Sequence, residues 1–308
     1  MALTIAQAAT LTNSMLLQGV VETIVNQSAV LKRLPFMDVI GSALAYPQET
    51  ALASAAFNVP GGSWVESTPT FAQVQEKLTI LGGDADVDNF LKRTYAATND
   101  IEAVILEEKA KAVAYTFSNY FFNGNPAAVA GVPGGLGGDA NAFAGLHARI
   151  IGTGQQILAA ANGATLSLSL LDQLIDLVKP GVPDVLYLSR RTRRQLNTLR
   201  RASGSLLQTS FDQFGNFIMT YDGIPLEVDD FIRDDATVGT SGAVCSTVYG
   251  VQHGFETGLM GLQNGMLQVD HFGALETKDA TRNRLKWYTG MTIFRPISCA
   301  MLAGITYP

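Results

Sequence analysis

Cysteine and histidine are scarce in this chain of 308 residues, which contains two cysteines and three histidines. Cys245 and Cys299 lie far apart in apolar stretches, so the sequence supports neither a disulfide framework nor a thiolate zinc site. A reducing compartment is the natural interpretation. His147, His253 and His271 are also far apart, and none has the spacing of a histidine metal site. We therefore predict no metal and no cofactor.

Catalytic motifs are absent as well. The stretches "ASGS" and "GTSG" do not supply the Gly-x-Ser-x-Gly of a nucleophile elbow. The glycine-rich segment 131–138 has no Gly-Lys-Ser/Thr ending and no dinucleotide-binding pattern, so a linker is favoured over a phosphate site. We propose no catalytic residue and predict that the chain is not an enzyme. A soluble α/β enzyme would need a convergent polar pocket that the sequence does not indicate.

Long apolar runs are missing too. The first 21 residues carry no charge, but they lack a basic start, and threonine, asparagine and serine interrupt them. The uncharged stretches 112–138 and 150–171 are broken by glycine, proline and amides, short of the ~20 apolar residues that a membrane span needs. We expect neither a signal peptide nor contact with a membrane.

Positive charge is in deficit except on one segment. The net charge is -6, and removing six arginines leaves 15 basic residues against 27 acidic ones. The chain as a whole does not attract DNA. The six arginines lie in "SRRTRRQLNTLRRASG", at Arg190, Arg191, Arg193, Arg194, Arg200 and Arg201.

This arginine-rich segment predicts an amphipathic helix. At 100° per residue, Arg190, Arg194 and Arg201 fall within about 40° of one another, opposite Leu196 and Leu199. Base-specific readout is not indicated, because few amide side chains accompany the arginines. Three uses remain open: ion pairs within or between subunits, a solvated face, and non-specific phosphate contact. We favour ion pairing, because arginine matches carboxylates and the rest of the chain is acidic.

The densest acidic group has two interpretations. It could hold a hard cation through oxygen ligands, but turn and loop positions are favoured. Its members are Asp222, Asp229, Asp230, Asp234 and Asp235.

A long β-hairpin is predicted over 46–81. Val74, Leu78 and Ile80 alternate with polar residues, and "NVPGGSW" supplies the turn. Such a hairpin is marginal alone and must lie against another surface. Trp64 at its tip and Lys77 on its second limb are therefore candidates for contact between subunits.

Helices and strands follow in an order that predicts an α+β fold. A helix over about 90–122 has apolar residues at helical spacing, and a glycine-rich loop follows it. "LSLSLLDQLIDLV" predicts a helix capped by Ser167, "DVLYL" a buried strand, and "FIMTYDGIPLEV" a hairpin turning at Asp222. "LQVDHFG" and "RLKWYTGMTIF" predict further strands, and the last apolar run ends at Ile305.

Three segments in this order carry a resemblance: "DVLYLSRRTRRQLNTLRRASG" from 184, "FGNFIMTYDGIPLEVDDFI" from 214, and "GALETKDATRNRLKWYTGMTIFRPISCAML" from 273. With them, the chain resembles the major capsid proteins of tailed bacteriophages, which share the Hong Kong ninety-seven fold with encapsulins. The resemblance covers most of the sequence. It implies an N-terminal arm (1–44), an extended loop (45–82), a peripheral domain (83–163) with a spine helix (92–122), an axial domain (164–265) that contains the arginine-rich helix, a return to the peripheral domain (266–294), and a last axial strand (295–308).

The resemblance also implies a function. It suggests a structural protein that self-assembles into hexamers and pentamers of an icosahedral head around double-stranded DNA, which it touches without sequence preference. The partners implied are further copies of the chain, a separate scaffold protein, a portal and a decoration protein, in a virion assembled in the host bacterial cytoplasm. The alternative is an encapsulin-like compartment around a cargo protein. Some such shells join a lysine to an asparagine beside a glutamate, but for Lys77 and Glu76 we expect only polar positions on a strand.

Overall fold

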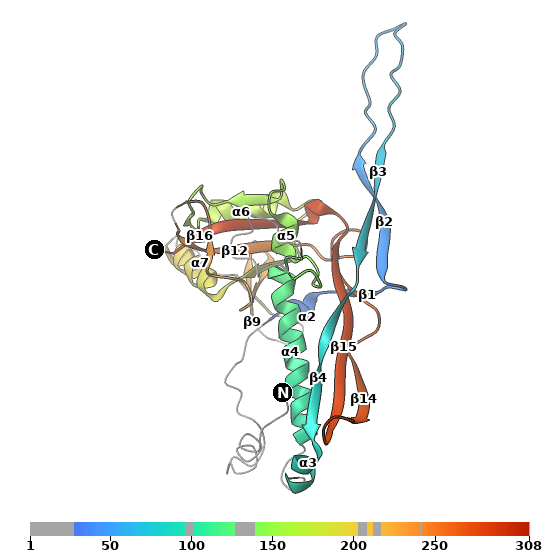
Figure 1. The fold of residues 1–308 in the computed structure, drawn as a ribbon. Coiled ribbons are helices and arrows are strands. Elements are labelled where there is room, and N and C mark those ends of the chain that lie inside the picture. The colour runs from blue at the N-terminus through green and yellow to red at the C-terminus, as the bar shows by residue number, and fades with distance from the viewer. Residues whose placement is uncertain are drawn as a thin grey trace.

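The computed structural model describes residues 28–95, 101–126, 139–202, 208–211, 217–240 and 242–307. A lobe of helices and strands adjoins a long stem, and a hairpin extends from the stem (Figure 1). Most of the predicted N-terminal arm and residues 127–138 of the glycine-rich loop lie outside the described residues. No described helix is long and apolar enough to cross a membrane.

The stem is built on a sheet in which five strands are described. β15 (Ala280–Ile293) is central and pairs antiparallel with β4 (Thr79–Asp88), β13 (Leu259–Gln263) and β14 (Gln268–Ala274), while β1 (Phe36–Asp38) pairs parallel with β13. Along β15, Leu285, Trp287 and Met291 are buried, whereas Arg284 is exposed. The period of two predicted for this strand is therefore confirmed from Arg284 to Thr289, whereas residues 289–292 are all buried.

A long helix, α4 (Ile101–Asn123), packs against this five-stranded sheet (Figure 1). Val113, Phe117 and Phe121, part of the predicted apolar stripe, are buried, and the Phe117 ring lies 4.9 Å from the Trp287 ring. α3 (Asn89–Tyr95) precedes it, so the described part of the expected helix consists of two segments.

The lobe contains a second sheet, of which nine strands are described. Its order is β5, β16, β12, β7, β10, β9 and β8, with β6 on β16 and β11 on β12. The bounds are β5 Gln156–Leu158, β6 Ala164–Thr165, β7 Val185–Leu188, β8 Gln208–Phe211, β9 Phe217–Tyr221, β10 Ile224–Val228, β11 Ala236–Thr237, β12 Val244–Val251 and β16 Cys299–Thr306.

Alternating residues of β7 divide the core of the lobe into two layers. Val185 and Tyr187 join a cluster with the end of α4 and with α5 (Leu146–Ile150), while Leu186 and Leu188 join one with α6 (Leu168–Leu177) and α7 (Arg190–Ala202). Because successive side chains point to opposite faces of a sheet, α6 and α7 cover one face and α4 and α5 the other.

The local signals predicted from sequence are present in the lobe. The Ser167 hydroxyl accepts a hydrogen bond from the Leu170 amide and caps α6. Asp222 and Gly223 both have positive φ, as a two-residue turn between β9 and β10 requires.

The predicted hairpin is formed by β2 (Ala43–Ala51) and β3 (Thr70–Lys77), paired in register from Ala43 opposite Lys77. Residues 52–69 form its tip, with a turn at Pro60 and Gly61. β3 leads through Leu78 into β4, so one continuous stretch of chain joins the hairpin to the five-stranded sheet. We name residues 43–77 the extended loop.

Three boundaries differ from those expected. The extended loop, expected over 45–82, ends at Lys77, because Thr79–Asp88 pair with β15 as strand β4. The chain reaches the five-stranded sheet again at β13, before residue 266, because β13 pairs with the last five residues of β15. β1, expected in the arm, is also part of this sheet. Two short helical elements complete the chain, α2 (Val30–Arg33) and a 3-10 turn at Pro296–Ser298.

Candidate functional site

The tip of the extended loop and the adjoining start of β3 expose large apolar side chains. Their exposed fractions range from 67% at Phe71 to 109% at Phe57, with Trp64 at 79%. The other members are Leu52, Val59 and Val65. Isolated exposed apolar residues are normal on a protein surface, but six of them within residues 52–71 at one end of a hairpin indicate an interaction site. We name these six residues the apolar tip.

The first limb of the extended loop is attached to the end of β15. The Tyr46 hydroxyl donates to the Ile293 carbonyl at 3.3 Å, and the Gln48 amide donates to the Phe294 carbonyl at 3.1 Å. The Tyr46 and Phe294 rings lie 5.0 Å apart. This limb is therefore fixed to the end of β15 at Tyr46 and Gln48, and it projects from there at Glu49 and beyond.

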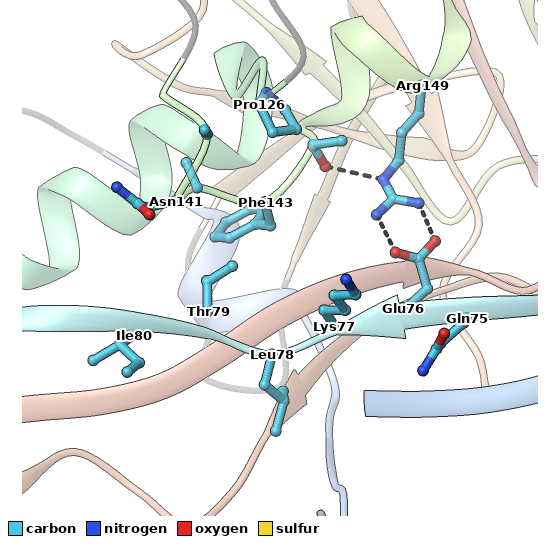
Figure 2. A pocket seen from close by; sticks show the side chains of 13 residues that line it. Gln75, Glu76, Lys77, Leu78, Thr79, Ile80, Pro126, Asn141, Phe143 and Arg149 are labelled. Carbon is cyan, nitrogen blue, oxygen red and sulfur yellow. Dashed lines mark hydrogen bonds and ion pairs between the residues drawn. The ribbon is translucent and has the colours of Figure 1, made fainter. Parts of the chain in front are cut away.

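The second limb is held by a charged clamp. Arg149 of α5 donates two hydrogen bonds to the Glu76 carboxylate, at 2.5 and 2.8 Å, and both side chains are 18% exposed (Figure 2). The same guanidinium donates to the carbonyls of Ala144 and Met291, each at 2.9 Å. Arg149 thus links α5, β15 and the extended loop, and sequence reasoning did not identify it.

A cavity of about 790 Å³ lies beside this clamp. It is lined by Gln75–Ile80 of β3 and β4, by Ala140–Ala144, and by Pro126 and Arg149 (Figure 2). Lys77 is one of the lining residues and is exposed. In the described ranges no group of three or more His, Cys, Asp or Glu side chains gathers as a metal site, and the cavity's acidic residue, Glu76, is engaged by Arg149.

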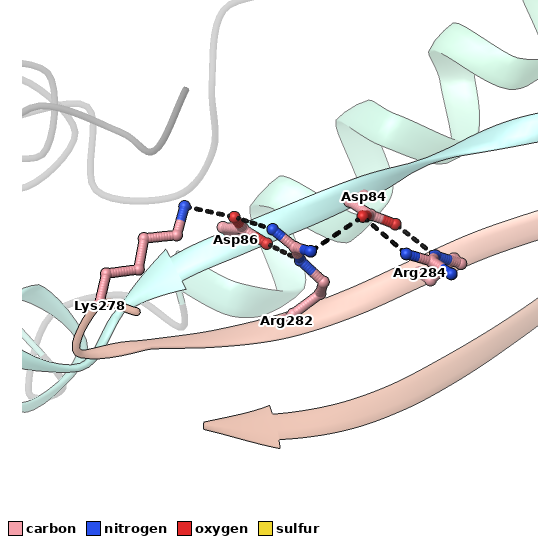
Figure 3. Close-up of polar contacts among 5 residues, drawn as sticks. All are labelled: Asp84, Asp86, Lys278, Arg282 and Arg284. Atoms are coloured by element: carbon pink, nitrogen blue, oxygen red, sulfur yellow. Dashed lines mark hydrogen bonds and ion pairs between the residues drawn. The ribbon is translucent and has the colours of Figure 1, made fainter. Parts of the chain in front are cut away.

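The stem below the clamp is reinforced by a ladder of ion pairs between β4 and β15. Asp84 lies opposite Arg284 and Asp86 opposite Arg282, each joined by two hydrogen bonds of 2.5–2.9 Å, and Lys278 also reaches Asp86 (Figure 3). The hydrogen bonds from Arg284 lower the pKa of Asp84, and those from Arg282 lower the pKa of Asp86 further. This ladder fixes the register of the two strands.

Three arginines of the arginine-rich helix, α7, contact other elements of the same subunit. Arg190 makes two hydrogen bonds to Asp230, at 2.6 and 2.8 Å. Arg191 lies 4.0 Å above the Tyr307 ring, and Arg200, buried, lies 4.8 Å from the Tyr221 ring. The cation-π contacts join α7 to the ends of β9 and β16, and the ion pair joins it to the loop after β10.

The acidic residues between 222 and 235 occupy a turn or form hydrogen bonds and ion pairs within the chain, which is the use favoured from the sequence. Asp229 is fully buried and accepts hydrogen bonds from Ser28, Ala29 and Phe231. Its burial raises its pKa. The other four make local contacts. Asp222 lies in the turn between β9 and β10, and Asp234 accepts a hydrogen bond from the Tyr307 hydroxyl. Asp230 forms an ion pair with Arg190, and Asp235 forms one with Arg233.

Asp229 also has a role that the sequence did not suggest. Together with the Arg33–Glu227 ion pair, its bonds to Ser28 and Ala29 attach the first described residues to the lobe.

No protein-family model and no curated protein matches the chain. Solved structures do match over almost its whole length. The subunit of the holo-SrpI encapsulin complex from Synechococcus elongatus PCC 7942 has 16% identity and a TM-score of 0.72, with 99% of this chain and 97% of that chain covered. The capsid of a native GTA particle has 11% identity and a TM-score of 0.65, covering 98% and 100%. Gordonia phage Cozz has 14% identity and a TM-score of 0.61, covering 98% and 94%.

These likenesses cover 98–99% of this chain, and they confirm the α+β fold predicted from sequence. The chain has the Hong Kong ninety-seven fold of tailed-phage capsid proteins and encapsulins.

Proposed function

We propose that the chain is the structural subunit of an icosahedral phage head, assembled from hexamers and pentamers around double-stranded DNA. The observation that carries the proposal is the apolar tip, which projects beyond a base fixed to β15 and α5. Burying one large apolar side chain contributes roughly 1.5–3 kcal/mol. A hairpin that keeps six of them exposed is therefore stabilised when a second copy covers it.

The direction of the extended loop favours a closed assembly. A loop that reaches from one subunit onto a different surface of the next makes a head-to-tail contact, and such contacts close into rings when the rotation permits. We assign the five-stranded sheet with α4 to the peripheral domain and the nine-stranded sheet to the axial domain near the ring centre. This function would be mechanical, without a catalytic residue.

The proposed head has further partners. A closed DNA-filled head needs an entry point and a means of setting its size, so we include a portal and a separate scaffold protein, with a decoration protein on the outside. The location is then the virion, after assembly in the cytoplasm of the host bacterium.

The encapsulin-like compartment is the second candidate, and the TM-score of 0.72 to the encapsulin subunit favours it. Both candidates predict closed shells from the same fold, and they differ in the content of those shells. A DNA-filled head protects nucleic acid from nuclease, whereas a compartment encloses protein.

Electron microscopy of the purified full-length chain tests the proposal, with light scattering to measure particle mass. Shells, tubes or free hexamers and pentamers support a shell subunit. The ultraviolet absorbance of nuclease-treated shells then separates the two candidates. A chain that remains monomeric, even with co-expressed neighbouring phage proteins, would overturn both.

A further inference from the structure

The outward face of α7 carries positive charge that its own subunit neutralises at Arg190, through Asp230, and leaves without an ion pair elsewhere along the described face. Leu196 is buried in the core below the helix, while Arg190, Arg194 and Arg201 are exposed. At 1.5 Å per residue this exposed line extends over roughly 16 Å. The α7 sequence contains no acidic residue, so no carboxylate within the helix offsets these charges.

The six arginines divide into two groups. Arg190, Arg191 and Arg200 are tied to the subunit by the contacts described above. Arg193, Arg194 and Arg201 form no salt bridge with any residue in the described part of the chain, and Arg201 bonds only the Asn197 carbonyl of its own helix. We name Arg193, Arg194 and Arg201 the open arginines.

The nearby carboxylates have other partners. Asp230 is bonded to Arg190, Asp235 to Arg233, and Asp172 accepts a hydrogen bond from the Tyr221 hydroxyl. On the peripheral side, Asp84 and Asp86 are held in the ladder of ion pairs. These five carboxylates of a second copy are therefore engaged already, which favours an anion from another molecule.

The side chains around the open arginines indicate which anion. Gln195 points toward the protein, where it donates to the Thr306 carbonyl. The outward face thus offers cations without a set of amides that could read base edges. Guanidinium groups of this kind match phosphate oxygens, which contribute affinity without sequence preference.

We propose that the open arginines of α7 contact the phosphate backbone of the enclosed DNA, so that the sheet face covered by α6 and α7 is turned toward the inside of the shell. This inference rests on the proposed function as a DNA-filled head. It goes beyond that function by naming the surface and the residues that meet the DNA.

The test measures how the affinity for DNA depends on salt. Full-length capsomers released from purified shells are titrated onto a short fluorescein-labelled DNA duplex of random sequence, and fluorescence anisotropy gives Kd at a series of salt concentrations. The logarithmic slope changes by about 0.9 for each phosphate contact. We expect the R194Q/R201Q variant to lose about 1.8 from this slope and to bind more weakly at every salt concentration.

A matched control separates these contacts from net charge. The K32Q/K179Q variant removes the same charge at two exposed lysines outside α7, and we expect its slope to stay close to that of the unaltered chain. Equal slopes for the two variants would overturn the inference. The inference would also be overturned if R194Q/R201Q weakened binding to polyglutamate and not to the duplex, because that result would identify an acidic polypeptide as the partner.

Failure of the proposed function appears at an earlier step of the same experiment. A chain that forms no shells yields no capsomers to titrate. If shells form and the duplex binds without involving the open arginines, the shell function stands and only this inference falls.

Discussion

Glu76 and Arg149 lie 73 positions apart in the sequence, and their side chains meet in a two-bond ion pair at the base of the extended loop. Two backbone carbonyls complete the contacts of the guanidinium. Because the pair is mostly buried, removing one partner leaves the other desolvated without compensation. The loop base is therefore rigid while the tip projects freely.

We expect Glu76→Gln to loosen the loop without unfolding the chain. The substitution leaves the Arg149 charge without its carboxylate, so the free energy of unfolding falls by about 1–3 kcal/mol. Hydrogen exchange along β2 and β3 accelerates more than exchange in β12. Lys77→Gln is the control, because Lys77 is exposed and forms no ion pair with the described residues. Unchanged exchange in β3 of the Glu76 variant would show that the clamp does not fix the loop.

We expect Trp64→Ser combined with Phe57→Ser to block assembly while the subunit stays folded. Both side chains are exposed, so their loss removes little from the isolated subunit. In a shell, each buried side chain contributes roughly 1.5–3 kcal/mol, repeated at every copy. Circular dichroism checks the fold, and sedimentation checks particle formation. Thr68→Ser on the same tip is the control, and shells of normal yield from the double variant would contradict a docking role for the tip.

The two cysteines should not react in the native protein. Both thiols are buried, and burial raises the pKa of Cys245 and raises that of Cys299 to about 12. Since the thiolate is the reactive form, maleimide modification should await unfolding. Mass spectrometry after labelling with and without urea measures this, and rapid native labelling of either cysteine would be inconsistent with the packing of β12 and β16.

Much of this fold could be predicted because its signals are local. The alternation along β15, the Ser167 cap and the Asp222 turn are each written within a few neighbouring residues. The outward line of arginines on α7 also follows from helical periodicity alone.

The contacts that fix the elements to one another were not predictable in the same way. Asp84 meets Arg284 across 200 positions, and Asp229 meets Ser28 across 201. Such pairs depend on strand register and chain path, which a single sequence does not display. The placement of β13 was missed for a related reason, since a five-residue apolar strand fits either sheet.

The pH dependence of stability should depend on His147. Its ring is buried, its Nδ1 lies 3.0 Å from the Tyr249 hydroxyl, and burial lowers its pKa from 6.5 to about 4. Between these two values the unfolded state binds a proton that the folded state does not, so stability rises with pH across this window and falls as pH drops from 6.5 toward 4. The loss amounts to about 3 kcal/mol for the full shift.

Urea unfolding of unassembled subunits between pH 7 and pH 4 measures this effect. We expect His147→Phe to reduce the pH dependence above pH 4, because a phenyl ring takes up no proton in either state, and to leave the part that arises from His253, whose pKa burial also lowers. The Asp84 and Asp86 carboxylates provide a built-in comparison. Their pKa values are lowered by arginine, so their contribution is lost only as pH falls below their ordinary value of 3.8. An unaltered slope between pH 6.5 and 4 in the variant would mean that another group takes up the proton.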